Sequence, residues 1–289
     1  MAGALMWTAL LTGVAFAATP GKALIVVAHP DDEYYFAATV YRMAVQLNGR
    51  VDELIITDGG GGFHYSTLAE PYYKKQLTNE TIGRRELPEI RKQEALNAGR
   101  ILGIRRHFFL GQSDARFTTH EDDGLHGWNS TLVVHKIAAL VREERYQYIL
   151  SVLPRSTTHG EHQAATALAA IAIQRLPENI RPVLLGFDTD PTDFQPTQKT
   201  QEGQVWAFTH AYVFDRTAKF GLHGALNYQI VVDWMIAEHK SQGLLQTMCG
   251  KDRREYAWID LATAPHSQAV ADSLFRTLGL SSVRQGGEQ

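Results

Sequence analysis

The sequence predicts an α/β protein with a mostly parallel sheet and helices on both faces of that sheet. Short, nearly continuous apolar runs are bounded by turn residues, which is typical of buried strands. Longer segments with helical periodicity separate these runs. This alternation favours parallel strands joined by crossover helices, because such helices cover both faces of a sheet.

The expected elements follow one another in a regular order along the chain. Strands are expected over 23–28, 53–58, 107–111, 148–154 and 182–187. Helices are expected between and after them, over 36–47, 86–104, 131–144 and 162–176. The stretch 188–204 is rich in Pro, Thr and Gln, so we expect it to be a surface excursion. A last long helix is expected over 225–246, and the chain after it carries little pattern.

Composition indicates an ordinary globular protein of one domain, expected over 18–289. Apolar residues make up 44% and charged residues 20% of the 289 residues, a balance that can bury a sizeable core. The formal net charge is -3 and no face-sized cluster of Lys and Arg occurs, which argues against a nucleic-acid partner. Cys249 is the only cysteine, so an internal disulfide is excluded and a thiolate metal site is disfavoured.

The N-terminus predicts export to the periplasm or the outside of the cell. Residues 1–17 form an uncharged apolar run that ends in Ala15-Phe16-Ala17, a small-residue pattern typical of signal cleavage. The run lacks the Lys or Arg that usually precedes such a segment. A retained membrane anchor and a buried first helix therefore stay as alternatives to a cleaved signal peptide. After cleavage we expect no stable membrane insertion.

Three consecutive carboxylates follow the first expected strand. Asp31, Asp32 and Glu33 stand beside His29 in the stretch "AHPDDE". Like charges this close raise one another's pKa values and oppose folding, so a cation among them is the economical explanation. On the tight turn that leaves the strand, His29 and Asp32 can converge. Ligands of open α/β sheets bind at the carboxyl ends of strands, where this stretch lies.

A second segment offers further metal ligands at the same edge of the sheet. His159 and His162 are three residues apart at the start of an expected helix, which puts them on neighbouring positions of one face. The segment also follows an expected strand. Two imidazoles with one carboxylate leave a coordination position for water, as in catalytic zinc sites.

Six motifs together resemble one known family. In order and spacing, the chain is similar to the N-acetylglucosaminyl-phosphatidylinositol deacetylase-like (PIG-L/LmbE-like) family from about Lys22 to Gln246. The motifs are "VVAHPDDE", "ITDGGGG", "IRKQEALNAGRILGI", "FLGQSD", "THGEHQAA" and "AEHKSQ". The resemblance implies a Rossmann-like fold and a zinc-dependent hydrolase that removes the acetyl group from N-acetylglucosaminyl conjugates, either small molecules or glycans. Other divalent metals are possible, because the same ligands accept several.

The resemblance also implies roles for individual residues. It makes His29, Asp32 and His162 the metal ligands and Asp31 the general base. A short carboxylate beside a ligand can take a proton from water and later deliver it to the departing amine. His159 would donate to the oxyanion or protonate the nitrogen, and orienting a ligand is its alternative role.

Three further residues are candidates for substrate binding, and one of them, Arg91, matches an arginine of the family. Arg91 would contact a polar or anionic part of the substrate, and Asp114 would bind sugar hydroxyls. His239 either lines the same pocket or is a buried, hydrogen-bonded helix residue. Glu161 stands where the family usually has Asp, which we expect to leave metal binding intact.

The leading hypothesis is thus a metal-dependent amidohydrolase, with two alternatives. A non-catalytic carbohydrate-binding module could keep the fold, although the intact set of motif residues argues against it. A nucleotide-binding oxidoreductase lacks the expected GxGxxG after the first strand. The aromatic, mixed-charge insertion over 63–90 suits stacking on sugar rings, and solvent-facing decoration is equally compatible with its composition.

Overall fold

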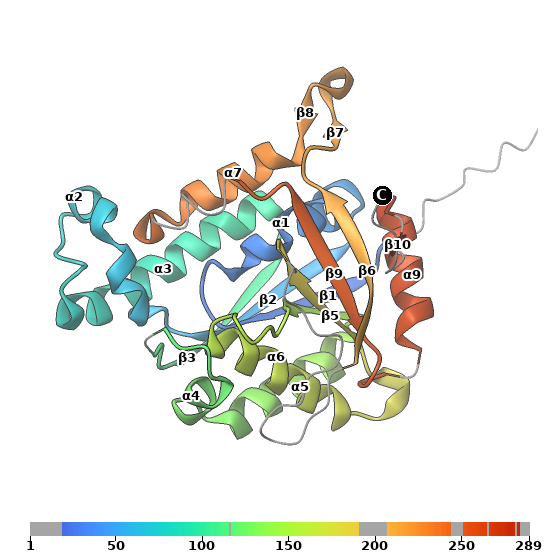
Figure 1. Ribbon diagram of the computed structural model, residues 1–289, viewed down its shortest axis with the longest axis horizontal. Coiled ribbons are helices and arrows are strands. Elements are labelled where there is room, and N and C mark those ends of the chain that lie inside the picture. Colours follow the sequence, from blue (N-terminus) through green and yellow to red (C-terminus); the bar gives the residue numbers. More distant parts are fainter. Residues whose placement is uncertain are drawn as a thin grey trace, which may run out of the picture.

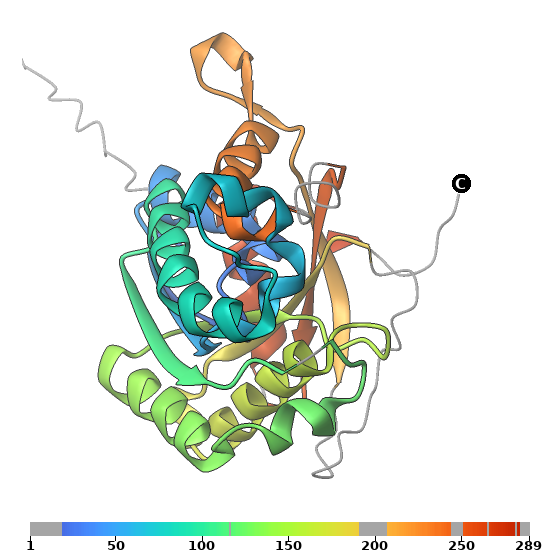
Figure 2. The ribbon, with the colours of Figure 1, turned by 90° about the vertical axis from the view of Figure 1, so that its left-hand side faces the viewer.

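A computed structural model describes residues 19–115, 117–190, 207–243, 251–264, 266–280 and 282–283. The predicted fold class is confirmed: a mostly parallel sheet lies between two layers of helices (Figures 1 and 2). The predicted export segment over 1–17 lies outside the described residues, as does most of the excursion over 188–204.

The described residues form an eight-stranded sheet in the order β10-β6-β9-β5-β4-β1-β2-β3. Strands β5, β4, β1, β2 and β3 are parallel, as expected, and β9, β6 and β10 extend the sheet in antiparallel fashion. Their bounds are β1 Lys22–Val27, β2 Arg50–Thr57, β3 Arg106–Gln112, β4 Tyr148–Val152, β5 Val183–Asp188, β6 Phe208–Asp215, β9 Arg254–Asp260 and β10 Ser282–Val283. A small hairpin of β7 Lys219–Phe220 and β8 Leu226–Asn227 projects from one end (Figure 1).

Two hydrophobic cores, one on each face of the sheet, explain the continuous apolar run of β1. Alternate residues point to opposite faces of a strand, so Ile25 joins one core and Val26 the other. The first core contains side chains of α1 Ala37–Tyr41, α3 Glu80–Leu102, α7 Tyr228–Glu238 and α9 Ser267–Leu278. The second contains side chains of α5 Ser130–Glu144 and α6 Gly160–Gln174, and α4 Glu121–His126 packs on α6.

The predicted insertion over 63–90 is mostly helical. A 3-10 helix spans Gly60–Tyr65, the short α2 spans Glu70–Tyr73, and α3 begins at Glu80. Helix α3 therefore starts six residues before the predicted position, because the Asn79 side chain accepts a hydrogen bond from the Ile82 backbone N–H and caps the helix. Phe63, Leu77 and Leu87 form a small separate core beneath this segment.

The last predicted helix is shorter than expected. Helix α7 ends at Glu238, and His239 has φ -82° and ψ 57°, outside the helical region. Strands β6, β9 and β10 were not predicted. Strand β9 pairs with β5, β6 with β9 and β10 with β6, and each of these antiparallel pairs depends on residues far apart in the chain. Within the described ranges, no helix combines the length and the apolar character needed to cross a bilayer.

Candidate active site

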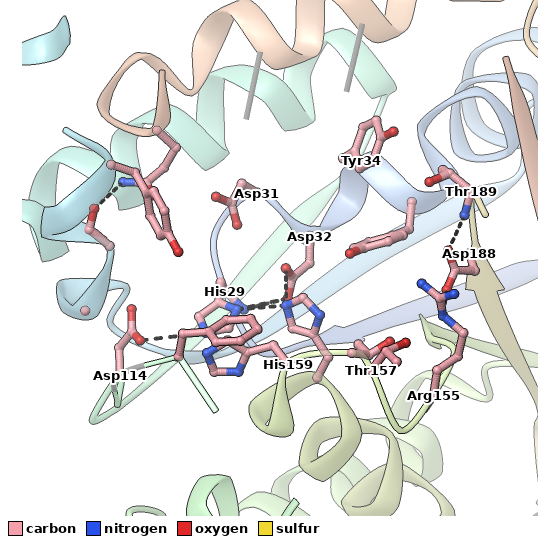
Figure 3. Close-up of a pocket in the computed structure, with 18 of the residues that line it drawn as sticks. His29, Asp31, Asp32, Tyr34, Asp114, Arg155, Thr157, His159, Asp188 and Thr189 are labelled. Atoms are coloured by element: carbon pink, nitrogen blue, oxygen red, sulfur yellow. Dashed lines mark hydrogen bonds and ion pairs between the residues drawn. The ribbon is translucent and has the colours of Figure 1, made fainter. Parts of the chain in front are cut away.

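A cavity of about 380 Å³ opens at the carboxyl ends of the parallel strands. Seven of the eight predicted site residues line it, and His239 is the exception. Figure 3 shows His29, Asp32 and His159 near the middle, Asp114 on one side, and Arg155 and Asp188 on the other. The cavity thus lies at the edge of the sheet where ligands of open α/β sheets bind.

The turn after β1 folds the "HPDD" stretch back on itself. The backbone N–H groups of Asp31 and Asp32 donate to the His29 carbonyl at 3.0 and 3.3 Å. In return, the His29 N–H donates to Asp32 Oδ2 at 2.8 Å. These local bonds fix the Asp32 carboxylate beside the His29 ring, and both side chains are buried.

His162 completes a candidate metal site with these two residues. Its Nε2 lies 2.9 Å from Asp32 Oδ1 and 3.1 Å from His29 Nδ1, and His29 Nδ1 lies 3.6 Å from Asp32 Oδ2. Two imidazole nitrogens and one carboxylate converging in this way are a donor set that suits a divalent cation such as zinc.

Glu161 holds the opposite side of the His29 ring. Its Oε2 lies 2.8 Å from His29 Nε2, and its Oε1 accepts the Ala115 N–H at 3.0 Å. A ligating histidine commonly donates its second ring N–H to a carboxylate, which fixes the tautomer and the orientation of the ring. The exchange of the family's Asp for Glu at this position thus leaves a carboxylate where it can orient His29.

The charges around the trio favour a cation at its centre. Burial lowers the pKa of His29, but the carboxylates of Asp32, Asp114 and Glu161 outweigh burial and raise it well above its usual value. Burial raises the pKa of Asp32, but His162 and His29 outweigh burial and hold it well below its usual range. A positive charge placed here is therefore strongly stabilised.

His159 caps helix α6 and presents one nitrogen to the cavity. Its Nδ1 accepts the Glu161 backbone N–H at 3.0 Å, so the neutral ring carries its proton on Nε2. Burial, followed by the charges on His29 and His162, lowers the pKa of His159 to about 3. His159 is thus a neutral N–H donor next to the candidate metal site.

Arg91 reaches the cavity from α3 and contacts the predicted base. Its Nη2 lies 2.8 Å from Asp31 Oδ2, its Nη1 donates to the Gly59 carbonyl at 2.8 Å, and Nη1 lies 3.6 Å from Asp114 Oδ2. Arg91 as a whole is only 2% exposed. Arg91 is therefore engaged mainly by the protein itself.

His239 does not line the cavity and pairs with Glu33. Its Nε2 is 2.6 Å from Glu33 Oε1, and both residues are buried. The sequence allows two roles for His239. The structure agrees with the second, a buried and hydrogen-bonded histidine.

Sequence reasoning missed the far part of the cavity. Arg155 and Asp188 line this part and form an ion pair at 2.7 Å, and Asp252 lines the cavity as well. The exposed Phe117, which packs on His159, is a further lining residue that was missed. Asp188 ends β5, and Arg155 follows shortly after β4. The strand-end rule that located His29 would have found these two as well, whereas no sequence pattern singles out Asp252.

Fold and site together define an α/β protein with a candidate metal site at the carboxyl ends of its parallel strands. The family model described as "GlcNAc-PI de-N-acetylase" (PIG-L) matches residues 24–173, just over half of the chain. The chain belongs to this family.

Individual proteins of known sequence or structure are also similar. A probable N-acetyl-alpha-D-glucosaminyl L-malate deacetylase 2 from Bacillus cereus is 27% identical over 162 residues, which span 56% of this chain and 64% of the relative. A deacetylase solved in complex with teicoplanin has a TM-score of 0.56 and 14% identity, covering 82% of this chain and 97% of that one. N,N'-diacetylchitobiose deacetylase from Pyrococcus horikoshii has a TM-score of 0.50 and 15% identity, covering 91% and 83%. At such low identities, the two structures show the fold alone.

Proposed function

We propose that this protein is a metal-dependent hydrolase that removes the N-acetyl group from an N-acetylglucosaminyl conjugate. One observation carries the proposal: His29, Asp32 and His162 converge within a cavity that also contains Asp31 and His159. Family membership and the similarity to a probable deacetylase from Bacillus cereus support the same reaction. Zinc is the expected metal.

A divalent cation bound by His29, Asp32 and His162 would supply Lewis acidity, polarising the amide carbonyl and making water easier to deprotonate. Asp31 is the general base in this proposal. Its carboxylate lines the cavity and directly precedes ligand Asp32, so it can accept the proton of the attacking water. The same proton can then pass to the leaving nitrogen as the C–N bond breaks, which yields acetate and a free amine.

His159 is the proposed hydrogen-bond donor to the oxygen that becomes negative during attack. Because its Nδ1 is occupied by the Glu161 N–H, its Nε2–H is free to donate. A donor that is neutral before the reaction begins stabilises the developing charge without competing with the cation for its ligands. Orientation of His162, one helical turn further along α6, is the alternative role.

The decisive experiment compares two single substitutions. In the proposed reaction, His162→Ala removes a ligand, so metal content should fall sharply from about one equivalent and activity should fall with it. Asp31→Asn should keep the metal but lose activity by a factor of about 10² or more, because an amide cannot accept the proton of water.

Acetate release from N-acetylglucosaminides is measured with and without a chelator, alongside metal analysis of each variant. Full metal content in His162→Ala would reject the ligand assignment, and loss of metal in Asp31→Asn would make Asp31 a ligand. Sugar binding without acetate release in the metal-loaded wild type would instead favour the non-catalytic binding module.

A further inference from the structure

The cavity extends past the candidate metal site into a second compartment with its own polar side chains. We call this compartment the aspartate lobe and define it by Arg155, Asp188, Thr189, Asp190 and Asp252. In Figure 3, Arg155, Asp188 and Thr189 lie on the far side of His159 and Thr157 from Asp114. A conjugate whose acetyl group lies at the candidate metal site and whose other end extends toward Arg155 would place that end in this lobe.

The only arginine among the lobe's residues is paired with an aspartate of the same lobe. Arg155 Nε lies 2.7 Å from Asp188 Oδ2, and Arg155 Nη1 donates to the Asp190 carbonyl at 2.6 Å. The Asp188 carboxylate is also held by the backbone N–H groups of Thr189 and Asp190, at 2.7 and 2.9 Å. The opposite charges of Arg155 and Asp188 offset each other, so this ion pair contributes no net charge to the lobe.

Two other carboxylates of the lobe are not neutralised by a cationic side chain of the described residues. In the part of the chain that the structure describes, no Lys or Arg forms an ion pair with Asp190 or Asp252. The Asp252 carboxylate accepts hydrogen bonds from two uncharged donors, the hydroxyls of Tyr34 and Thr189, the latter at 2.8 Å. Asp190 is exposed at the rim. The described residues of the lobe therefore carry two excess negative charges.

The cavity as a whole shows the same excess of negative charge. Six aspartates and two arginines are among the described residues that line it, which leaves four uncompensated carboxylates. A divalent cation at His29, Asp32 and His162 would offset two of these four charges. The other two correspond to Asp190 and Asp252, away from the candidate metal site.

We infer that the aspartate lobe selects a conjugate whose second part is an uncharged, hydroxyl-rich group, such as another sugar ring, and disfavours one that carries a carboxylate or phosphate. Sugar hydroxyls donate well to carboxylate oxygens, which are acceptors only. An anionic group would instead face like charges in a partly enclosed cavity. The inference rests on the proposed deacetylation and names its substrate class.

The test uses two disaccharides that differ in one carboxylate. N-acetylglucosamine linked β-1,4 to glucose is compared with N-acetylglucosamine linked β-1,4 to glucuronic acid, on the metal-loaded full chain. For wild type, kcat/KM should favour the neutral disaccharide by about tenfold or more, given the strength of charge repulsion in a partly buried site. Equal values, or preference for the anionic disaccharide, would overturn the inference.

Matched variants locate the cause of the preference. The double variant Asp190→Asn with Asp252→Asn keeps acceptors for Tyr34 and Thr189 and should reduce the preference to about twofold or less. Asp233→Asn removes one charge from the exposed face of α7, outside the cavity, and should leave the preference unchanged. A preference that persists in the double variant, with unfolding temperatures unchanged, would show that these carboxylates do not set it.

Binding separates failure of this inference from failure of the proposed function. Dissociation constants of both disaccharides are measured by titration calorimetry on Asp31→Asn, which does not depend on turnover. Absence of turnover on both disaccharides in wild type would overturn the proposed function. The inference would still be judged by the ratio of the two dissociation constants, and equal binding of both would reject it.

Discussion

Arg91 is the residue whose structural position changes its interpretation most. The sequence predicts that it contacts a polar or anionic part of the substrate. In the structure its guanidinium bonds Asp31 and the Gly59 carbonyl. The glycine run makes room for it: a Cβ on Gly62 would lie 2.5 Å from Arg91 Nη1. Gly59 also has φ +72°, a conformation that favours glycine. Arg91 is thus placed to position the proposed base.

We predict that Arg91→Lys and Arg91→Ala lower kcat/KM on free N-acetylglucosamine as well as on a larger conjugate. Loss of a charge-assisted hydrogen bond to Asp31 should cost about 1.5–3 kcal/mol, or roughly 10- to 100-fold. The lysine variant should retain part of the activity, because it can still place one ammonium near Asp31. Steady-state kinetics on both substrates checks the prediction, with thermal unfolding as the control for folding. A loss confined to the conjugate would return Arg91 to the substrate-binding role that the sequence predicts.

At the scale of elements, the end of α7 supports the turn that carries the metal ligands. His239 leaves the helix and pairs with Glu33, which directly follows Asp32. Burial lowers the pKa of His239, but the Glu33 carboxylate outweighs burial and raises it to about 9. The pair is therefore ionic at neutral pH and joins two segments about 200 residues apart.

We predict that His239→Leu lowers the free energy of unfolding by about 3 kcal/mol or more, because it leaves the Glu33 charge buried without its partner. The matched control is His135→Leu, the same change at an exposed position of α5, which should have little effect. Urea unfolding at pH 7 measures both variants. Similar stabilities for the two would show that Glu33 does not depend on His239.

At the scale of the whole molecule, the edge of the sheet opposite the cavity carries its own ionic network. Asp52, at the start of β2, is fully buried and accepts hydrogen bonds from Arg105 and Arg106 at 2.7 and 2.8 Å and from the Tyr146 hydroxyl. Burial raises the pKa of Asp52, but these donors outweigh burial and lower it to about 2. The network ties β2 to the start of β3 and to the residues that follow α5.

The lowered pKa of Asp52 predicts an acid-sensitive contribution to stability. The contribution is fully present above the unfolded value near 3.8 and is lost as the pH falls through about 2. Asp52→Asn should therefore lower the free energy of unfolding by about 2 kcal/mol at pH 7, with activity retained because Asp52 is remote from the cavity. Urea titrations of wild type and variant from pH 7 downward should converge at low pH. A stability difference independent of pH would contradict the assignment.

The parallel half of the sheet and most of the candidate site follow from local patterns in the sequence. Buried strands and amphipathic helices are local patterns, and His29 and Asp32 converge on a turn of four residues. His162 could be assigned to the same edge because parallel strands end together. Export, the single-domain boundary and the native metal stay predictions.

The partner of each buried charge could not be predicted, because it depends on how the folded chain packs. In the structure, β9 lies between β5 and β6, and Arg91 contacts Asp31. His239 pairs with Glu33, and Asp252 accepts a hydrogen bond from Thr189. These contacts join residues far apart in the chain. A buried charge must find an opposite charge or hydrogen-bond donors wherever the packed fold provides them, and that choice leaves no periodic signal in the sequence.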